Sequence, residues 1–447
     1  WGVRGWAATW RICKGTRLWC ERLVVVFLLQ HLRPESMTLT PLSLRAPVAI
    51  FLAGLTAALH IGKIPPAIVV LQQSLGVSLV EAGFLLSMAQ LAGMLLGVLV
   101  GALSDGFGLR RSMLWGLCVL CIASLAGMWA RQPSDLLVLR ALEGLGFLCI
   151  VLPAPSLMRQ LVPAARLSQF LGLWGAYMPA GVAIALLLGP AAMALWSWQA
   201  WWGLLGVLAG CAALWLAWAV APDNQRATTE TVSAQGAPSA VTVLAQRLRI
   251  TLTSSGPWAV AVAFAMYSSQ WLAIIGFLPS IYVQAGVSGQ MAGALTALAC
   301  VANVAGNLVA GALLRSGWRA HRLLLIGFSS TAVATVVAFS PLAGDGYALR
   351  FVAVVVFSAV GGMIPATLFA LAVRAAPSEH TVSTTMGWMQ QCSALGQFLG
   401  PPLVAWVAGL VGGWQLTLVV TGMASAVGVG VARWVGRQSF GREDPSS

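Results

Sequence analysis

The stretch GALSDGFGLRRSMLWG occupies residues 101–116, and a similar stretch, GALLRSGWRAHRLLLIG, occupies residues 311–327. Each follows a long apolar segment and contains arginines, and the second begins about 210 residues after the first. Two further pairs repeat at this spacing, namely Arg140 with Arg350 and Pro155 with Pro365. The repeats predict a duplicated unit, with one copy in each half of the chain.

The composition around these repeats is that of a membrane protein. Of the 447 residues, 59% are hydrophobic and 8% are charged, whereas soluble proteins carry about 25% charged residues. About twelve apolar stretches of about 19–29 residues are each long enough to cross a bilayer as a helix. They cover residues 48–71, 79–103, 112–130, 135–158, 168–191, 198–220, 257–283, 290–314, 321–340, 347–373, 381–409 and 414–436. Their length and lack of strict alternation favour helices over barrel strands. We therefore predict an all-α membrane protein with twelve transmembrane helices in two pseudo-symmetric six-helix bundles.

A polar, Ala/Thr/Ser-rich stretch from Ala221 to Arg249 divides these segments six and six, as expected of a linker between bundles. The first residue is Trp1, and Met37 is followed by a short tail that enters the first apolar segment. Met37 is thus the predicted natural start. The predicted organisation is an upstream extension (1–36), a first bundle (37–220), a cytoplasmic linker (221–256), a second bundle (257–437) and a cytoplasmic tail (438–447).

The formal net charge is +13, a value that also suits a nucleic-acid-binding protein. From Met37 onward, however, most arginines lie on alternate loops and on the tails. This pattern is the positive-inside bias of membrane proteins, so no nucleic-acid partner is expected. It predicts a multi-pass protein of a bacterial-type inner membrane, with membrane lipid around it and both termini in the cytoplasm.

The segment ALHIGKIPPAIVV, residues 58–70, places ionisable side chains inside the first apolar stretch. A charge such as that of Lys63 near the bilayer centre costs at least about 2.5–3.5 kcal/mol. His60 lies three residues earlier, on the same helical face. Pro65 and Pro66 remove backbone donors and are expected to kink the helix. This profile predicts substrate-binding roles for His60 and Lys63. A structural lysine paired with Glu143 or with a carbonyl is the alternative.

The fourth apolar stretch contains Arg140 and Glu143, which lie on one helical face. They form either a local ion pair or a site in which Arg140 binds substrate and Glu143 carries a proton. Lys63, Arg140 and Arg350 outnumber Glu143, and this positive excess favours a small anion in the cavity, although Arg350 near a helix end can equally reach the interface. His60 and Glu143 are the candidates for proton coupling.

The second half supplies uncharged polar groups. Tyr267, Gln270 and Gln391 are the predicted substrate ligands there, because buried amides and phenols need a hydrogen-bond partner, either on another helix or on a ligand.

The stretch GALSDGFGLRR resembles the signature G-x-L-x-D-x-x-G-x-R-R of the major facilitator superfamily, and LLVLRALEG, residues 136–144, resembles its fourth-helix arginine motif. The resemblance covers Leu44 to about Arg437 and implies a transporter that works by alternating access. It also implies a gate built from the following residues: Gly101, Asp105, Gly108, Arg110 and Arg111.

Within that superfamily, GFLPSIYVQAGVSGQMAGALTAL, residues 276–298, is similar to the cyanate/nitroimidazole porter group. Met178 replaces the glycine of the fifth-helix motif of proton-coupled exporters, and this disfavours drug efflux. An exporter of drug-like or nitroaromatic compounds remains the alternative to an anion transporter. No phosphate-binding loop or metal-ligand spacing occurs, so the prediction is a monomeric, non-enzymatic secondary transporter without cofactor or metal.

Overall fold

The computed structural model describes residues 41–97, 107–163, 170, 174–223, 240–340 and 347–438. Met37 and the predicted extension, Gly101, Asp105 and residues 224–239 of the predicted linker lie outside these ranges. In the described residues, twelve helical segments are long and apolar enough to cross a membrane. This confirms the predicted all-α class and the number of spans.

The first half contains α2 (Pro41–Gly62), η2 (Pro65–Ala67), α3 (Ile68–Leu75), α4 (Leu79–Ser87), η3 (Met88–Gln90), α6 (Leu109–Gly127), α7 (Pro133–Val151), α8 (Ala154–Leu161), α10 (Tyr177–Leu195) and α11 (Trp198–Ala219). The second half contains α13 (Ala240–Thr253), α14 (Ser255–Gln284), α15 (Gly289–Arg315), α16 (Ala320–Phe339), α17 (Tyr347–Gly361), α18 (Met363–Ala375), η5 (Glu379–Thr381), α19 (Val382–Val411) and α20 (Thr417–Val435).

Several of the spans are interrupted helices. The first breaks between α2 and η2, at the predicted kink before Pro65 and Pro66. The fourth breaks between α7 and α8, and the tenth breaks between α17 and α18. Pro155 and Pro365, which repeat in the sequence, lie near the starts of α8 and α18. Proline is tolerated in the first helical turn because its missing N–H has no partner there anyway. The same break therefore recurs in both halves.

Side-chain caps fix the ends of other spans. Ser78 Oγ accepts a hydrogen bond from the Glu81 N–H at 3.2 Å, and Glu81 Oε2 accepts one from the Ser78 N–H at 2.8 Å. This reciprocal capping box satisfies two N–H groups that the first turn leaves unbonded. Gly76, with φ of 67°, ends α3 just before it, because the left-handed region suits glycine.

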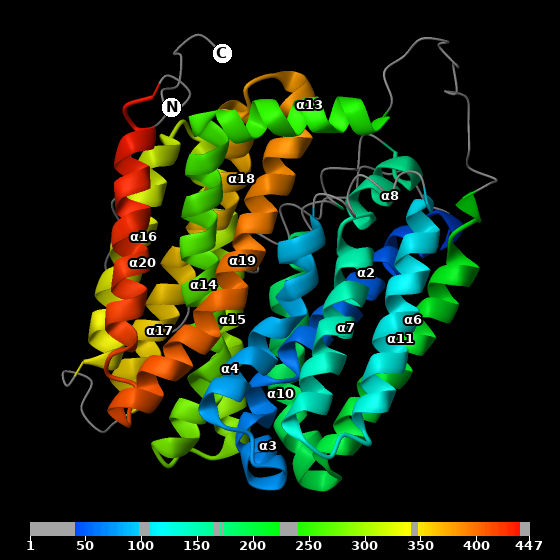
Figure 1. Ribbon diagram of the computed structural model, residues 1–447, viewed down its shortest axis with the longest axis vertical. Helices are drawn as coiled ribbons and strands as arrows, with labels where there is room; N and C mark the ends of the chain where they lie inside the picture. The colour runs from blue at the N-terminus through cyan, green and yellow to red at the C-terminus, as the bar shows by residue number, and fades with distance from the viewer. Residues whose placement is uncertain are drawn as a thin grey trace, which may run out of the picture. The chain divides into compact units, whose positions relative to one another are not determined.

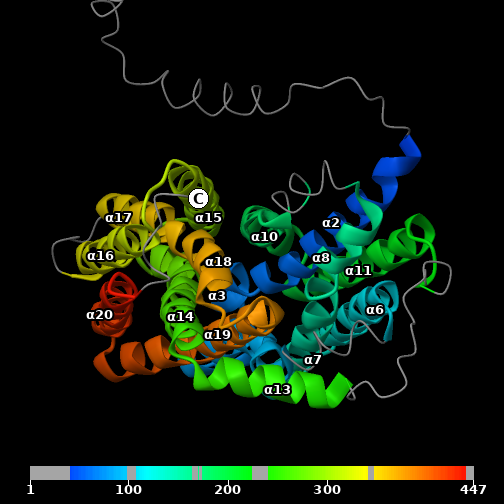
Figure 2. The ribbon, with the colours of Figure 1, turned by 90° about the horizontal axis from the view of Figure 1, so that it is seen from above.

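Residues from Arg45 onward form one compact unit. Figure 1 shows helices α14 to α20 grouped apart from helices α2 to α11, and Figure 2 shows the same two groups from above. The groups meet where α10 packs on α15 and where α4 packs on α19. Figure 1 shows α13 at one end of the helices, running from the top of α14 toward the side of the first group.

Glycines permit the close approach of helices within the second group. A Cβ on Gly306 of α15 would overlap the carbonyl oxygen of Ala359 in α17, and a Cβ on Gly362 would overlap the carbonyl oxygen of Asn303. Small residues at helix crossings let backbones pack closely in a bilayer, where association depends on packing. The reciprocal pair therefore fixes how α15 crosses the broken tenth span.

The substitution Gly306→Ala is expected to destabilise the protein by about 1–3 kcal/mol, because the new methyl group forces α15 and α17 apart. Gly430→Ala in α20 is the matched control, since nothing lies within 4 Å of its Cβ position. The control should be neutral or stabilising by up to about 1 kcal/mol, as alanine favours helix. Thermal unfolding of the two purified variants tests this difference: the midpoint should fall for Gly306→Ala and stay or rise for Gly430→Ala. Equal midpoints would contradict the close helix contact at Gly306.

Candidate functional site

The structure brings His60, Lys63, Arg140 and Glu143 together in the first half. We call these four residues the charged quartet. Their side chains are buried, with exposed fractions of 1%, 0%, 1% and 2%. Lys63 Nζ donates to Glu143 Oε1, and Arg140 Nη1 donates to Glu143 Oε2 at 2.7 Å. His60 Nδ1 lies 3.5 Å from Glu143 Oε1. One carboxylate is thus shared by three nitrogen-bearing side chains.

Lys63 has two further partners. Its Nζ donates to Ser124 Oγ of α6 at 3.0 Å and lies 4.7 Å from the ring centroid of Trp202 in α11. Ser124 Oγ in turn donates to the Trp202 carbonyl oxygen at 2.8 Å. The pairing of Lys63 with Glu143 was the alternative to direct substrate binding. Sequence patterns did not indicate Ser124 or Trp202, because they lie on separate segments and match no motif.

Arg140 connects three helices. Its Nε donates to the Leu85 carbonyl oxygen of α4 at 3.1 Å, and its Nη1 donates to the His60 carbonyl oxygen at 2.7 Å as well as to Glu143. The His60 carbonyl belongs to the last turn of α2, just before the break. The final carbonyls of a helix lack partners within the helix. The break next to Pro65 thus leaves a carbonyl that the guanidinium can bind.

Two of the three polar residues predicted in the second half, Tyr267 and Gln270, bond to other second-half groups. Tyr267 Oη accepts a hydrogen bond from Asn303 Nδ2 at 2.6 Å. Gln270 donates to the Met266 carbonyl oxygen at 3.1 Å and accepts from Ser425 Oγ at 3.1 Å. Within the part of the chain that the structure describes, neither residue bonds to the charged quartet, and their assignment as substrate ligands stays a prediction.

Gln391 occupies a different kind of position. Its Nε2, on α19, donates to the Met94 carbonyl oxygen at 2.7 Å, and Met94 lies in the second span of the first half. Gly93 in the same turn lies against Ala394. This hydrogen bond links the two halves. The Gln391 amide also has a second N–H and an acceptor oxygen, so its role as a substrate ligand stays a prediction.

The described part of the predicted gate meets an acidic residue that sequence analysis missed. The carboxylate of Asp223 accepts hydrogen bonds from the backbone N–H groups of Arg110 and Arg111, at 3.2 and 3.0 Å. It lies against Gly108, whose φ of 101° disfavours a side chain. Arg110 Nη2 also donates to the Ala217 carbonyl oxygen at 2.7 Å. A carboxylate at a helix N-terminus is favourable, because it satisfies free N–H groups and complements the helix dipole.

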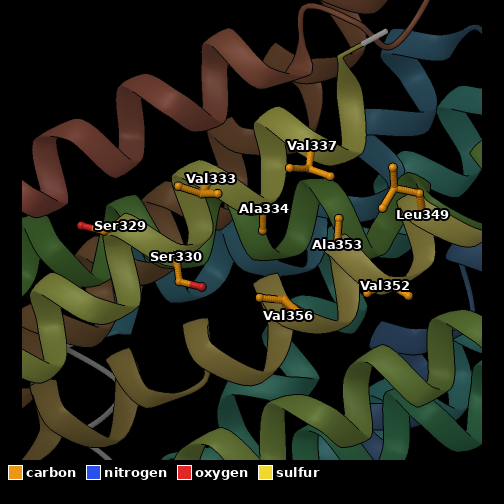
Figure 3. Close-up of a pocket in the computed structure, with 9 residues that line it drawn as sticks. All are labelled: Ser329, Ser330, Val333, Ala334, Val337, Leu349, Val352, Ala353 and Val356. Atoms are coloured by element: carbon orange, nitrogen blue, oxygen red, sulfur yellow. The ribbon is translucent and has the colours of Figure 1, made fainter. Parts of the chain in front are cut away.

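A pocket of about 450 Å³ lies away from the charged quartet, between α16 and α17 (Figure 3). Its wall is almost entirely apolar and is formed by Ser329, Ser330, Val333, Ala334, Val337, Leu349, Val352, Ala353 and Val356. None of the predicted site residues that the structure describes lines it. In the described residues, no three His, Cys, Asp or Glu side chains are grouped so as to hold a metal ion.

Twelve spans around a buried charged cluster are the features of a polytopic membrane protein, and buried charges in membrane spans often mark substrate or ion pathways. The sequence pattern of the Major Facilitator Superfamily matches residues 48–401, and the chain belongs to that family. It is therefore a multi-pass membrane transporter that acts on a small-molecule substrate, and it is not an enzyme. The predicted resemblance is confirmed.

Two relatives indicate how varied the substrates of similar chains are. The chain is 24% identical over 287 residues to the cyanate transport protein CynX of Escherichia coli (strain K12), covering 62% of this chain and 69% of the relative. It is 28% identical over 314 residues to the multidrug transporter MdfA of Shigella boydii serotype 4 (strain Sb227), covering 67% of this chain and 72% of the relative.

Solved structures support the fold. A bacterial homologue of the human lysosomal transporter Spinster, in an inward-facing and occupied conformation, superposes with a TM-score of 0.73 at 14% identity, over 92% of this chain and all of that one. A D-xylose–proton symporter superposes with a TM-score of 0.69, also at 14% identity, over 90% of this chain and 98% of that one.

Proposed function

We propose that the protein is a secondary transporter that moves a small anion across the inner membrane by alternating access, coupled to protons. The observation that carries this proposal is the charge of the quartet. Lys63 and Arg140 share the single carboxylate of Glu143, so two cations minus one carboxylate leave one net positive charge when His60 is neutral. A buried positive excess attracts an anion.

The relative named as a cyanate transport protein supports a small anion as substrate. Proton coupling follows from the membrane potential, because a negative interior opposes anion entry and an accompanying proton cancels the charge. The arginine bias of the loops supports both termini in the cytoplasm. The substrate would bind where the two halves face each other, as in other transporters built from repeats.

The second candidate is export of drug-like compounds, which the multidrug transporter relative favours. An exporter of apolar cations would gain nothing from a net positive cluster, because like charges repel. The anion proposal therefore accounts better for the quartet.

The test is uptake by proteoliposomes that contain the full chain, with labelled cyanate, formate, acetate and nitrate as separate probes. We expect saturable uptake of at least one probe, faster when the outside is acidic and slowed when a protonophore removes the gradient. Protein-free liposomes report the passive entry of the protonated acids. Absence of anion flux, together with proton-driven ethidium transport, would replace this proposal with the export function.

A further inference from the structure

Some nitrogen atoms of the charged quartet have hydrogen-bond partners and others have none in the described residues. An ammonium group has three N–H donors. Those of Lys63 face Glu143, Ser124 and the ring of Trp202, and its side chain is fully buried. This leaves Lys63 no donor for a ligand. It holds the Glu143 carboxylate in place and balances its charge.

Two other atoms of the quartet have no partner in the described part of the chain. They are Arg140 Nη2 and His60 Nε2. The remaining guanidinium nitrogens of Arg140 are bonded to Leu85, His60 and Glu143, and His60 Nδ1 faces Glu143. Buried polar side-chain atoms are bonded in the large majority of cases, and leaving one unbonded costs about 1–3 kcal/mol.

The two unbonded atoms belong to one small region. Arg140 donates to the backbone carbonyl of His60, and both side chains face the same carboxylate. Both side chains are 1% exposed. A guanidinium edge and an imidazole nitrogen are suitable partners for a compact oxyanion, because the guanidinium keeps its charge and its planar donors match two oxygens.

We propose that Arg140 Nη2 and His60 Nε2 form the anion-binding site, that His60 takes up the coupled proton, and that Lys63 is a positioning residue. This inference rests on the proposed function and deepens it. Neutral His60, donating through Nδ1 to Glu143, presents Nε2 as an acceptor, which repels an anion. A proton on Nε2 turns that atom into a donor. The proton and the anion therefore bind together.

The surrounding charges fix the stoichiometry. The titratable and charged groups facing His60 are Glu143 and Arg140 on α7 and Lys63 after α2. With neutral His60 the quartet carries one net positive charge, and a proton raises this to two. One bound monovalent anion returns it to one. The loaded and empty sites thus have equal charge, so one proton is expected to accompany each anion.

The test adds cyanate or formate to the purified full-length protein in weakly buffered detergent solution and measures proton uptake. Binding of the labelled probe is measured in parallel. Wild type should take up about one proton per anion bound near pH 7, and binding should weaken at least tenfold between about pH 5.5 and about pH 8. His60→Gln keeps an uncharged donor, so it should bind weakly, independently of pH and without proton uptake. His380→Gln, an exposed histidine in η5, is the matched control and should behave as wild type.

Lys63→Met should retain about one proton per bound anion, although the half-saturating concentration rises. If Lys63 only positions Glu143, its loss should weaken anion binding without changing the number of protons taken up per anion. Unchanged proton uptake in His60→Gln would overturn the inference while leaving anion transport intact, since another group would then carry the proton. Lack of binding of either probe at all these pH values would also overturn the site, and anion flux in proteoliposomes would still decide the proposed function independently.

Discussion

Glu143→Gln is expected to lower the stability of the protein by about 3–5 kcal/mol, which is typical when one partner of a buried ion pair is removed. The glutamine is nearly isosteric but cannot compensate Lys63 and Arg140, which would remain as two buried cations. The loss should appear as a lower midpoint of thermal unfolding in detergent and a lower yield from membranes. Anion uptake should fall as well, because Arg140 loses the group that orients it.

A second substitution separates charge from shape. In the double variant Lys63→Met/Glu143→Gln the quartet returns to one net positive charge, so we expect it to recover part of the lost stability. Glu379→Gln, on an exposed glutamate in η5, makes the same chemical change at the surface and should be almost neutral. If Glu143→Gln unfolded at the wild-type midpoint, or if the double variant were less stable than Glu143→Gln, the shared-carboxylate account would be wrong.

Much of the fold is predictable because its causes are local. The length and hydropathy of each apolar segment determine that it spans the membrane. Pro65 and Pro66 predict the break in the first span, whatever the helix packs against. The repeat of Pro155 at Pro365 likewise coincides with breaks in the fourth and tenth spans. These features depend on a few neighbouring residues, so no knowledge of helix rotation is needed.

The site was only partly predictable, because side-chain direction depends on helix rotation and crossing. The sequence indicates that Lys63 needs a partner in the bilayer, but not that Ser124 and Trp202 occupy its other donors. Tyr267 and Gln270 were predicted as ligands on residue type alone, whereas their polar groups meet Asn303 and Ser425. Asp223 carries no recognisable pattern, and only the folded chain shows it beside Arg110.

Arg140→Lys is the second substitution with a large expected effect, although it preserves the charge. A lysine can still approach Glu143, but a single ammonium on a flexible stem cannot reproduce the fork that binds Leu85 and His60. At least one buried carbonyl would lose its partner, at about 1–3 kcal/mol each, so we expect a destabilisation of about 2–4 kcal/mol. Anion uptake should fall at least tenfold, since the free Nη2 edge disappears.

The sequence repeat provides the control for this substitution. Arg350 matches Arg140 at the repeat spacing, but it is half-buried and donates from Nε to the Ala338 carbonyl oxygen at 3.0 Å. Arg350→Lys should therefore change the unfolding midpoint and the uptake rate only slightly. Thermal unfolding and proteoliposome uptake of both variants provide the comparison. If Arg140→Lys changed the unfolding midpoint and the uptake rate no more than Arg350→Lys does, Arg140 would act only as a positive charge. The hydrogen bonds of its guanidinium to two helices and to an anion would then have no functional role.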